Sequence, residues 1–438
     1  MTSDHHGHRA FGVVTLRTSH LGLAARRALE LLLLSPCLLS AQTAVGGVNG
    51  RTPPNRCMDA HVTDAPARID DVHTLYVEQE TVSAQRDGRV LVAGEPAFLW
   101  RKTGARTEFI VQDSIVGMVI TPPENVAALL SPLRGRALTA MRSAALPDGW
   151  WLVTFVEVVP VPMPAQPRVL DLWAGETDGT RWRRVERLPK VPDSLVARTV
   201  SALAYRDGRV LFSMQSYLDG ERRAVLFARG PAGWSASRFD VGARSYVATA
   251  LTDTHDILAV VRNDSTEQED DNSLFIFSRP RGDSAWSRIT RLVRAFRTPT
   301  YDPRFAARTD GLLLTWRARS EDGREETAWS TRLDARGDTV GAIRRFAVDG
   351  GLVYHAPHGD RGVWVVTNRR RPFDHLQLIE HDSSAAPIGT VEERTEYGGV
   401  LGAAISGKYV VIIASRRGPW PQEAAVISLI RSYPWRCQ

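Results

Sequence analysis

The stretch DGRVLFSM, residues 207–214, joins an Asp-Gly turn to an apolar run, and related stretches recur along the chain. They read DGRVLV from Asp87, DGWWLVTF from Asp148, HDILAVV from His255, DGLLLTW from Asp310, DRGVWVVT from Asp360 and SGKYVVII from Ser406. Successive starts are 61, 59, 48, 55, 50 and 46 residues apart. Asp-Gly between apolar runs is a strong signal for a β-hairpin, and a repeat of this length is typical of four-stranded propeller blades. We therefore predict an all-β fold, a β-propeller.

Each repeat holds the parts of a four-stranded sheet. The third reads SALAY from Ser201, RVLFSMQSY from Arg209, RRAVLFAR from Arg222 and WSASRFD from Trp234, with turns between them. Helical spacing of apolar residues is not evident in the repeats. Seven units predict seven blades. A six-bladed ring, with the irregular stretch from Glu95 to Leu138 outside it, is the alternative.

The last repeat has no room for a fourth strand before Gln438. The alternating segment HTLYVEQE, from His73, could supply that strand, so the ring is expected to close through an N-terminal strand that covers an exposed edge. The predicted organisation is a signal peptide with an extended leader over 1–41, an irregular lead-in over 42–70 and a single propeller domain over 71–438.

Residues 26–42 read RRALELLLLSPCLLSAQ, in outline a secretory signal: two arginines, a leucine-rich segment and small residues. Glu30 and Leu39 depart from the usual pattern. The apolar stretch is too short to span a bilayer, so no stable membrane insertion is expected once the signal is removed. We predict an exported protein, periplasmic or extracellular.

Removal of the signal would leave two cysteines, Cys57 and Cys437. In an exported protein such a pair predicts a disulfide, and a closed ring brings distant parts of a chain together. The bond would close a loop of roughly 380 residues, for which chain-entropy models give about 5 kcal/mol before strain is subtracted. Two unpaired thiols are the alternative.

The basic balance, 55 Lys+Arg against 49 Asp+Glu, is carried almost wholly by arginine, since Lys102, Lys190 and Lys408 are the only lysines. It indicates either a compositional bias or an anionic partner, because guanidinium groups bind carboxylate and phosphate bidentately. No compact basic stripe interleaved with aromatics is present, so nucleic acid is not a predicted partner. We expect a monomer.

Metal and cofactor motifs are not found in the sequence, which contains no HExxH, phosphate loop, CxxC or Gly-x-Ser-x-Gly. His355 and His358 lie three apart near Asp360, but this spacing in a strand and turn does not put both rings on one face. No metal or cofactor is therefore predicted.

Arginines follow the second strand in four consecutive repeats. This position returns to the same end of the ring in every blade, so their guanidinium groups could together bind an anionic glycan or an acidic loop of a protein partner. Accidental stacking is the rival interpretation in a chain this rich in arginine. The residues are Arg262, Arg317 and Arg319, Arg369, and Arg416 and Arg417.

Three turns, TDGTRW from Thr177, RGPAGW from Arg229 and RGDSAW from Arg281, resemble degenerate Asp-boxes of sialidase-like propellers, where the box is structural. The segment FRTPTYDPRFAARTDGLLLTWRARSEDG, from Phe296, is similar to the opening blade of that family. The resemblance implies that Arg297 corresponds to the arginine that binds the substrate carboxylate, although Thr298 stands where the family has isoleucine. The family's other catalytic residues, two further arginines, a tyrosine with a glutamate and an acid aspartate, have no motif counterpart here.

These observations favour an exported propeller that binds an anionic carbohydrate or a protein partner without catalysis. One alternative is a sialidase-like glycoside hydrolase of the exo-α-sialidase type, with Arg297 in its carboxylate site. The other is a protein-interaction scaffold of the cell envelope.

Overall fold

The computed structural model divides the chain into residues Met1–Arg51 and one compact unit, Thr52–Gln438. The predicted signal peptide, residues 1–41, lies outside the described residues, as do Arg297 and Arg417. The structure describes residues 56–58, 67–70, 75–76, 82–96, 98–103, 106–111, 115–123, 125–133, 135–136, 138–159, 168–190, 201–218, 221–239, 246–263, 272–296, 300–319, 326–348, 351–370, 373–395, 397–416 and 427–437.

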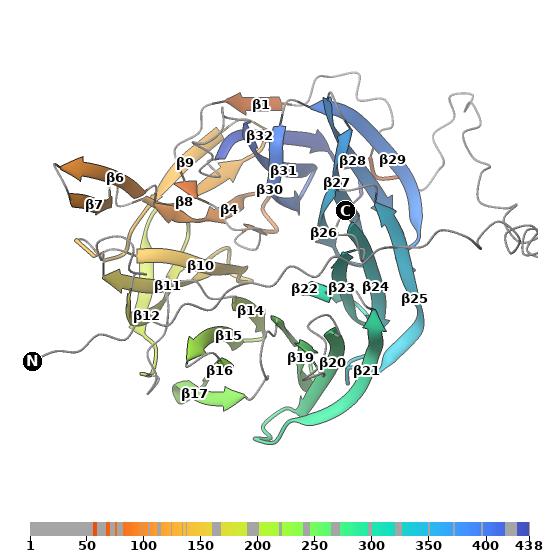
Figure 1. The fold of residues 1–438 in the computed structure, drawn as a ribbon, viewed down its shortest axis with the longest axis horizontal. Coiled ribbons are helices and arrows are strands. Elements are labelled where there is room, and N and C mark those ends of the chain that lie inside the picture. Colours follow the sequence, from red (N-terminus) through yellow and green to blue (C-terminus); the bar gives the residue numbers. More distant parts are fainter. Residues whose placement is uncertain are drawn as a thin grey trace, which may run out of the picture. The chain divides into compact units, whose positions relative to one another are not determined.

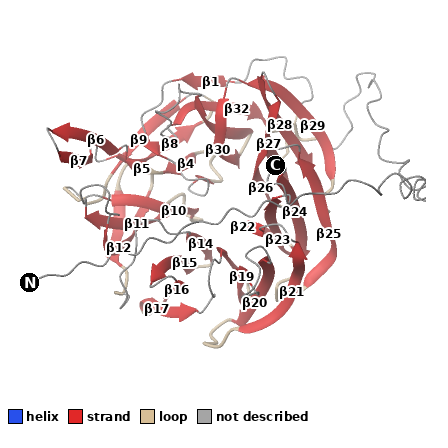
Figure 2. Ribbon diagram, viewed as in Figure 1, coloured by secondary structure: helices blue, strands red, loops and turns tan. Residues whose placement is uncertain are grey.

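Seven four-stranded antiparallel sheets follow one another around a central axis (Figure 1), which confirms the predicted seven-bladed β-propeller. The described residues contain strands and turns but no helix (Figure 2), and hence no helix that could span a bilayer. Five sheets are built from consecutive strands joined by hairpins, with the first strand of each innermost. The Asp-Gly turns join the first strand of a blade to the second, as the repeats predict.

The first blade contains the stretch that the six-bladed alternative placed outside the ring. Its sheet is β3 (Val82–Ala84), β4 (Val90–Ala93), β8 (Ile115–Thr121) and β9 (Asn125–Leu130). Between its second and third strands the chain forms a hairpin, β6 (Phe98–Thr103) with β7 (Arg106–Val111), and a short pair, β2 (Leu75–Tyr76) with β5 (Glu95–Pro96). The irregularity is thus an insertion within a blade.

The next five blades keep the four-strand order without exchange. Blade 2 is β10 (Leu138–Ala145), β11 (Trp151–Val159), β12 (Arg168–Thr177) and β13 (Trp182–Arg187). Blade 3 is β14 (Ser201–Arg206), β15 (Arg209–Leu218), β16 (Glu221–Gly230) and β17 (Gly233–Phe239). Blade 4 is β18 (Tyr246–Leu251), β19 (His255–Asn263), β20 (Asn272–Pro280) and β21 (Ser287–Phe296). Blade 5 is β22 (Thr300–Arg308), β23 (Gly311–Arg319), β24 (Glu326–Leu333) and β25 (Thr339–Val348). Blade 6 is β26 (Gly351–His358), β27 (Arg361–Arg370), β28 (Phe373–His381) and β29 (Pro387–Thr395).

Blade 7 closes the ring with a strand from the N-terminal side. It contains β30 (Tyr397–Ser406), β31 (Tyr409–Arg416) and β32 (Ile427–Pro434), and its outer strand is β1 (Ala67–Asp70), where Ala67 lies opposite Ser432. Closure by an N-terminal strand is confirmed, but the prediction that the segment from His73 supplies this strand was wrong. Leu75 and Tyr76 of that segment pair with β5 instead, and the closing strand comes from the stretch expected to be an irregular lead-in. Only four residues are needed to cover the edge, too few for a readable alternation.

Arginines near the turns join neighbouring blades. Arg89 donates to the carbonyls of Asp178 at 2.6 Å and Gly149 at 3.2 Å in blade 2, and Arg209 donates to Asp256 at 2.9 Å in blade 4. Part of the arginine excess therefore has a structural use, because these guanidinium groups satisfy carbonyls and carboxylates across the junctions between blades.

Aspartates also organise turns between the third and fourth strands. Asp178 Oδ1 accepts from the backbone N–H groups of Thr180 at 2.9 Å and Arg181 at 3.0 Å. Asp334 and Asp382 accept in the same way in blades 5 and 6, outside the three turns that resemble Asp-boxes. A carboxylate that accepts from the backbone N–H groups of its own turn stabilises the tight turn locally.

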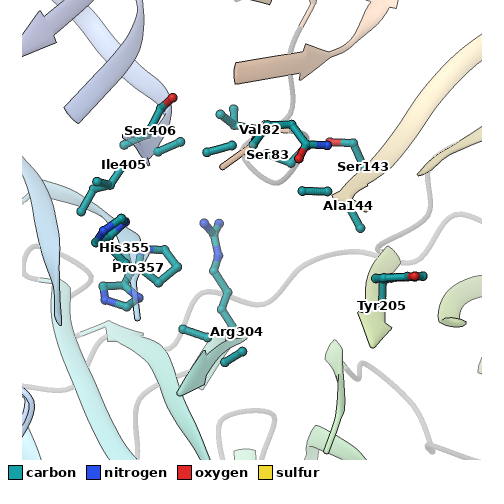
Figure 3. Close-up of a pocket in the computed structure, with 18 of the residues that line it drawn as sticks. Val82, Ser83, Ser143, Ala144, Tyr205, Arg304, His355, Pro357, Ile405 and Ser406 are labelled. Carbon is teal, nitrogen blue, oxygen red and sulfur yellow. The ribbon is translucent and has the colours of Figure 1, made fainter. Parts of the chain in front are cut away.

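The innermost strands surround a central cavity, part of which is drawn in Figure 3. Outside them, apolar side chains pack between successive blades, and neighbouring residues on one strand enter opposite junctions. On β27, Val363 and Val365 pack toward blade 7, whereas Trp364 and Val366 pack with Ala328 of blade 5. This is the two-residue period of a strand, applied to a sheet that is buried on both faces.

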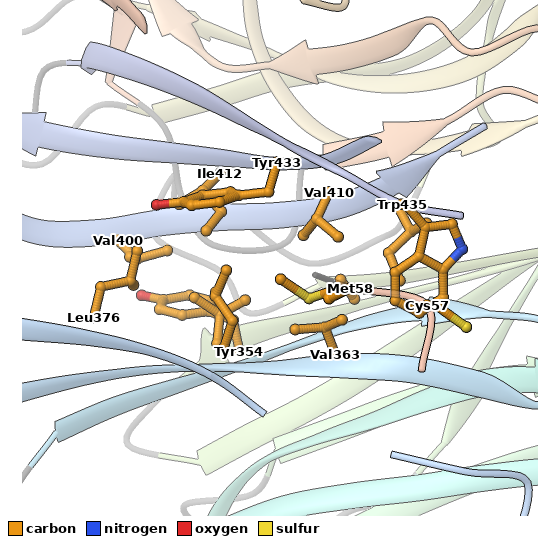
Figure 4. Close-up of a cluster of buried hydrophobic side chains, with 14 of the residues drawn as sticks. Cys57, Met58, Tyr354, Val363, Leu376, Val400, Val410, Ile412, Tyr433 and Trp435 are labelled. Atoms are coloured by element: carbon orange, nitrogen blue, oxygen red, sulfur yellow. The ribbon is translucent and has the colours of Figure 1, made fainter. Parts of the chain in front are cut away.

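A disulfide joins Cys57 to Cys437, with Cα atoms 5.0 Å apart, and confirms the predicted pair. Cys57 and Met58 are buried in an apolar cluster of blades 6 and 7 that includes Tyr354, Val410 and Trp435 (Figure 4). The bond therefore lies inside packed structure, where it fastens residues 56–58 beside the closing sheet.

Candidate functional site

The central cavity has a volume of about 1070 Å³ and is lined chiefly by inner strands and the turns that follow them. Four cationic side chains line it: Arg86, Arg142, Arg304 and Lys408. Among the described lining residues Asp87 is the one carboxylate, and it forms a salt bridge at 2.7 Å with Arg89. The described lining therefore carries a net positive charge.

Arg142 and Arg304 occupy equivalent places in blades 2 and 5. Each lies six residues before the aspartate of its Asp-Gly turn, and each is the first paired residue after an irregularity in the register of the inner strand. Their partners across the hairpin are also alike, the buried threonines Thr154 and Thr315. An added residue in a strand changes the face on which the following side chains lie, so these bulges place arginines on the cavity wall.

Arg304 extends from β22 into the open centre of the cavity (Figure 3), and its Cζ lies 5.8 Å from the centre of the Tyr354 ring. Pro303 precedes it within the irregular stretch, a place where the missing N–H of proline costs no ladder hydrogen bond. Arg142 is 5% exposed, so its charge lies in a largely desolvated wall. Charges of this kind act strongly on a ligand because little water screens them.

His355 and His358 also line the cavity, both on β26. His355 Nε2 lies 2.8 Å from Nε2 of His381, the last residue of β28, and the His355 ring packs 4.5 Å from that of Trp364. Burial, followed by the charges of His381, Arg304 and Arg308, holds the pKa of His355 well below the ordinary histidine value. Burial alone lowers the pKa of His358.

Hydroxyl groups complete the polar part of the wall. Ser83 and Ser143, from the inner strands of blades 1 and 2, are hydrogen-bonded to each other at 2.8 Å, and Ser406 of blade 7 donates to the Gly88 carbonyl. The remainder of the lining is mostly small and apolar, including Ala144, Ala248 and Ala404. Such a wall offers hydrogen-bonding groups on an otherwise apolar surface, as ligand sites usually do.

Metal ligands are not gathered in this wall or elsewhere in the described part of the chain, where no three His, Cys, Asp or Glu side chains are placed to hold one ion. His355 and His358 do not act together, since His355 pairs with His381 instead.

The arginines predicted from the second strands lie at the end of the ring away from the Asp-Gly turns. Arg317 is opposite Tyr301 and Arg416 opposite Tyr397, each level with the start of an inner strand. Arg317 is 9% exposed. The backbone places Arg262 on β19, Arg319 on β23 and Arg369 on β27, near the same ends. None of these five is among the described lining of the cavity, and their role in binding stays a prediction.

Sequence reasoning missed Arg142, Arg304 and the contact between His355 and His381. A signal for the arginines was available in their common distance from the turn aspartate. This signal could not be interpreted from the sequence. A bulge reverses the face on which the following side chains of an inner strand lie, and the sequence pattern does not show where a bulge occurs.

No family model matches the chain, and no curated protein matches it. Among solved structures, it is similar to an α-L-arabinanase of Penicillium chrysogenum complexed with arabinobiose, with 12% identity, a TM-score of 0.45, and coverage of 67% of this chain and 93% of that one. It is also similar to polysaccharide lyase Uly1, with 9% identity, a TM-score of 0.45, and coverage of 88% and 95%. The hemagglutinin-neuraminidase of parainfluenza virus 5 has 8% identity, a TM-score of 0.40, and coverage of 66% and 88%. Likenesses this distant carry no inference about activity.

Proposed function

We propose that this chain is an exported propeller that binds an anionic carbohydrate in its central cavity, without catalysis. The observation that carries the proposal is the equivalent placement of Arg142 and Arg304 by two bulges on the wall of one cavity. A bulge interrupts the ladder of a strand and is a costly way to place a charge that serves no purpose.

The sign of the ligand's charge follows from the wall. Arg86 and Lys408 add to the two bulge arginines, and the carboxylate of Asp87 already accepts from Arg89. An anion entering the cavity would meet cations held by a low-dielectric wall, and charge-assisted hydrogen bonds to guanidinium groups are among the stronger polar contacts.

The size of the cavity supports a ligand larger than an inorganic anion. A volume of about 1070 Å³ exceeds what one sulfate or phosphate fills and is at the upper end of ligand pockets. The hydroxyl groups of Ser83, Ser143 and Ser406 and the small apolar surfaces between them suit a molecule that alternates hydroxyl groups with C–H faces. A sugar acid, free or within an oligosaccharide, combines these properties.

Calorimetric titration tests the proposal. Tetragalacturonate should bind and maltotetraose, a neutral sugar of the same length, should not. Arg304→Gln and Arg142→Gln should each raise the dissociation constant about tenfold or more, since hydrogen bonds to charged groups contribute roughly 1.5–3 kcal/mol.

Arg336→Gln is the matched control, because Arg336 is exposed on the turn between β24 and β25 and does not line the cavity. It removes the same charge and should leave binding unchanged. Equal binding of the two sugars, or an unaltered dissociation constant in both cavity variants, would refute the proposal. Turnover of a fluorogenic sialoside between pH 4 and 8 would favour the hydrolase alternative, and Arg297→Ala should then abolish it.

A further inference from the structure

The His355–His381 pair has a single arrangement of protons that satisfies its hydrogen bonds while both rings are neutral. His381 Nδ1 lies 3.0 Å from the Asp382 carbonyl, which can only accept, so this nitrogen carries the proton. His381 Nε2 is then an acceptor and receives the N–H of His355 Nε2 at 2.8 Å. His355 Nδ1 is left as the one ring nitrogen of the pair outside these bonds.

Cations surround the pair on the side of blade 5. Burial is the largest cause of the lowered pKa of His355, and the charges of His381, Arg304 and Arg308 lower it further. Burial is also the largest cause of the lowered pKa of His381, and the charge of Arg308 lowers that pKa as well. Both arginines are on β22. The opposing carboxylates are engaged elsewhere: Asp310 at the next turn and Asp360 after β26 lie against Arg308. From blade 6, Asp382 acts in the opposite direction: its backbone carbonyl and its carboxylate charge both raise the pKa of His381, although that carboxylate also accepts from Ser384.

Space for the two rings depends on Gly362, which lies opposite His381 in the sheet. A Cβ at this position would come within 2.7 Å of His381 Nε2 and 2.9 Å of His355 Nε2. The glycine thus leaves the volume in which the imidazoles meet, and His355 carries this contact to the cavity wall.

We propose that binding of an anion in the cavity is coupled to uptake of one proton by the His355–His381 pair, at His355 Nδ1. The inference rests on the proposed function. Arg304 reaches the cavity and stands close enough to His355 to oppose its charge, so an anion held by Arg304 offsets the repulsion between the guanidinium and an imidazolium. His355 then changes from an acceptor to a donor toward the ligand, while its hydrogen bond to His381 is kept.

The coupling has a definite sign. The pair is neutral in the free protein at neutral pH, and the bound anion makes the protonated form more favourable. Between the pKa of the pair in the free protein and its higher pKa in the complex, binding therefore takes up a proton. Affinity should rise as pH falls through that window, by at most about tenfold per pH unit for one proton.

Calorimetry of tetragalacturonate binding at pH 5, 6, 7 and 8 tests the coupling. The sugar carboxylates stay ionised over this range because such groups titrate near pH 4. At each pH, titrations in buffers of different ionisation enthalpy give the number of protons exchanged, and we expect net uptake, of at most one proton, within that window. Binding with no proton exchange and no dependence on pH would overturn this inference while leaving the proposed function intact. Failure of tetragalacturonate to bind at any pH would overturn both.

Two variants assign the proton. His355→Gln should bind with its pH dependence lost, because an amide does not titrate. His255→Gln is the control, because His255 begins β19 and is not among the residues that line the cavity, and it should keep the wild-type dependence. Proton uptake that persists in His355→Gln or vanishes in His255→Gln would contradict the assignment. The wild-type measurement decides the coupling even where a variant folds poorly.

Discussion

Blade 6 meets blade 7 through an apolar interface closed by a disulfide, whereas its interface with blade 5 adds arginines and histidines to a small apolar cluster, although both interfaces come from the same four strands. On β26, Tyr354 enters the cluster that contains Cys57 and Met58, whereas its neighbour His355 contacts His381 and is near enough to Arg304 for that charge to lower its pKa. On β28, Glu380 accepts from the Cys57 and Met58 N–H groups at 2.8 and 3.2 Å, and the next residue, His381, meets His355.

The difference shows how strand alternation separates two tasks. The face toward blade 7 excludes water and holds the ring closed, and its one buried carboxylate serves backbone donors. The face toward blade 5 places titratable groups and guanidiniums next to the cavity, where a change in charge can reach a ligand. The following variants act on one face at a time.

Removing the disulfide should have the largest effect. Cys57→Ala with Cys437→Ala should lower the free energy of unfolding by up to about 5 kcal/mol, because the unfolded chain loses a cross-link spanning 380 residues. Urea unfolding of the oxidised protein and the double variant measures this, with reduced wild-type protein as the comparison. A loss below about 1 kcal/mol would mean that packing alone closes the face toward blade 7.

Arg308→Met tests the opposite face. The Arg308 side chain is 3% exposed and donates to the Asp360 carbonyl at 3.1 Å, to the Ser383 carbonyl and to Asp310. Losing these bonds, of which those to Asp360 and Ser383 join blade 5 to blade 6, should reduce stability by about 3 kcal/mol in urea unfolding. The exposed Arg336→Met should change it by less than about 0.5 kcal/mol. Equal values for the two variants would remove the structural role assigned to Arg308.

Glu380→Gln returns to the face toward blade 7 with a smaller change. The two carboxylate oxygens receive one backbone donor each, and an amide offers only one oxygen, so one buried N–H would face an NH₂ group. We expect a loss of about 2 kcal/mol, the cost of one unsatisfied buried donor. Glu392→Gln makes the same chemical change at an exposed position of blade 6 and serves as the control. An unchanged midpoint in Glu380→Gln would show that residues 56–58 are held by packing and the disulfide alone.

Acidification should weaken the face toward blade 5 most selectively. His355 and His381 have folded pKa values below their unfolded values, so below pH 6.5 the unfolded chain binds more protons and stability falls as pH falls. The slope is at most about 1.4 kcal/mol per pH unit for each proton. Urea midpoints between pH 7 and 5 measure it, and His355→Gln with His381→Gln should flatten the curve. A slope that survives in this double variant would place the responsible groups elsewhere.

The sequence predicted the blades well because each depends on local chemistry. An Asp-Gly turn and the apolar run after it define a hairpin within a few residues, and the chain repeats that unit. The closing strand was harder. The segment from His73 alternates more clearly than Ala67–Asp70, but edge pairing is decided by which segment reaches β32 after the ring has formed.

The candidate site depends on irregularities that no repeat pattern records. Arg142 and Arg304 stand after register shifts, which reverse the expected facing of an inner strand. His355 is paired with Trp364 of β27, and His381 is paired with Gly362 of the same strand. The two histidines meet because these partners lie two residues apart, so the contact is set by the register of two hairpins. Cys57 and Cys437 could be paired from composition alone, since only two cysteines follow the predicted signal.

The closing sheet also sets an order of events during biosynthesis. It combines β1, made early, with β30 to β32, so a ribosome must add more than 360 residues after Asp70 before the last hydrogen bonds of the sheet can form. Blades 1 to 6 can assemble before that point. Until blade 7 is complete, the apolar face of blade 6 stays exposed and is prone to non-specific association. The chain is therefore expected to be most prone to association in the interval after blade 6 has folded and before blade 7 has closed the ring.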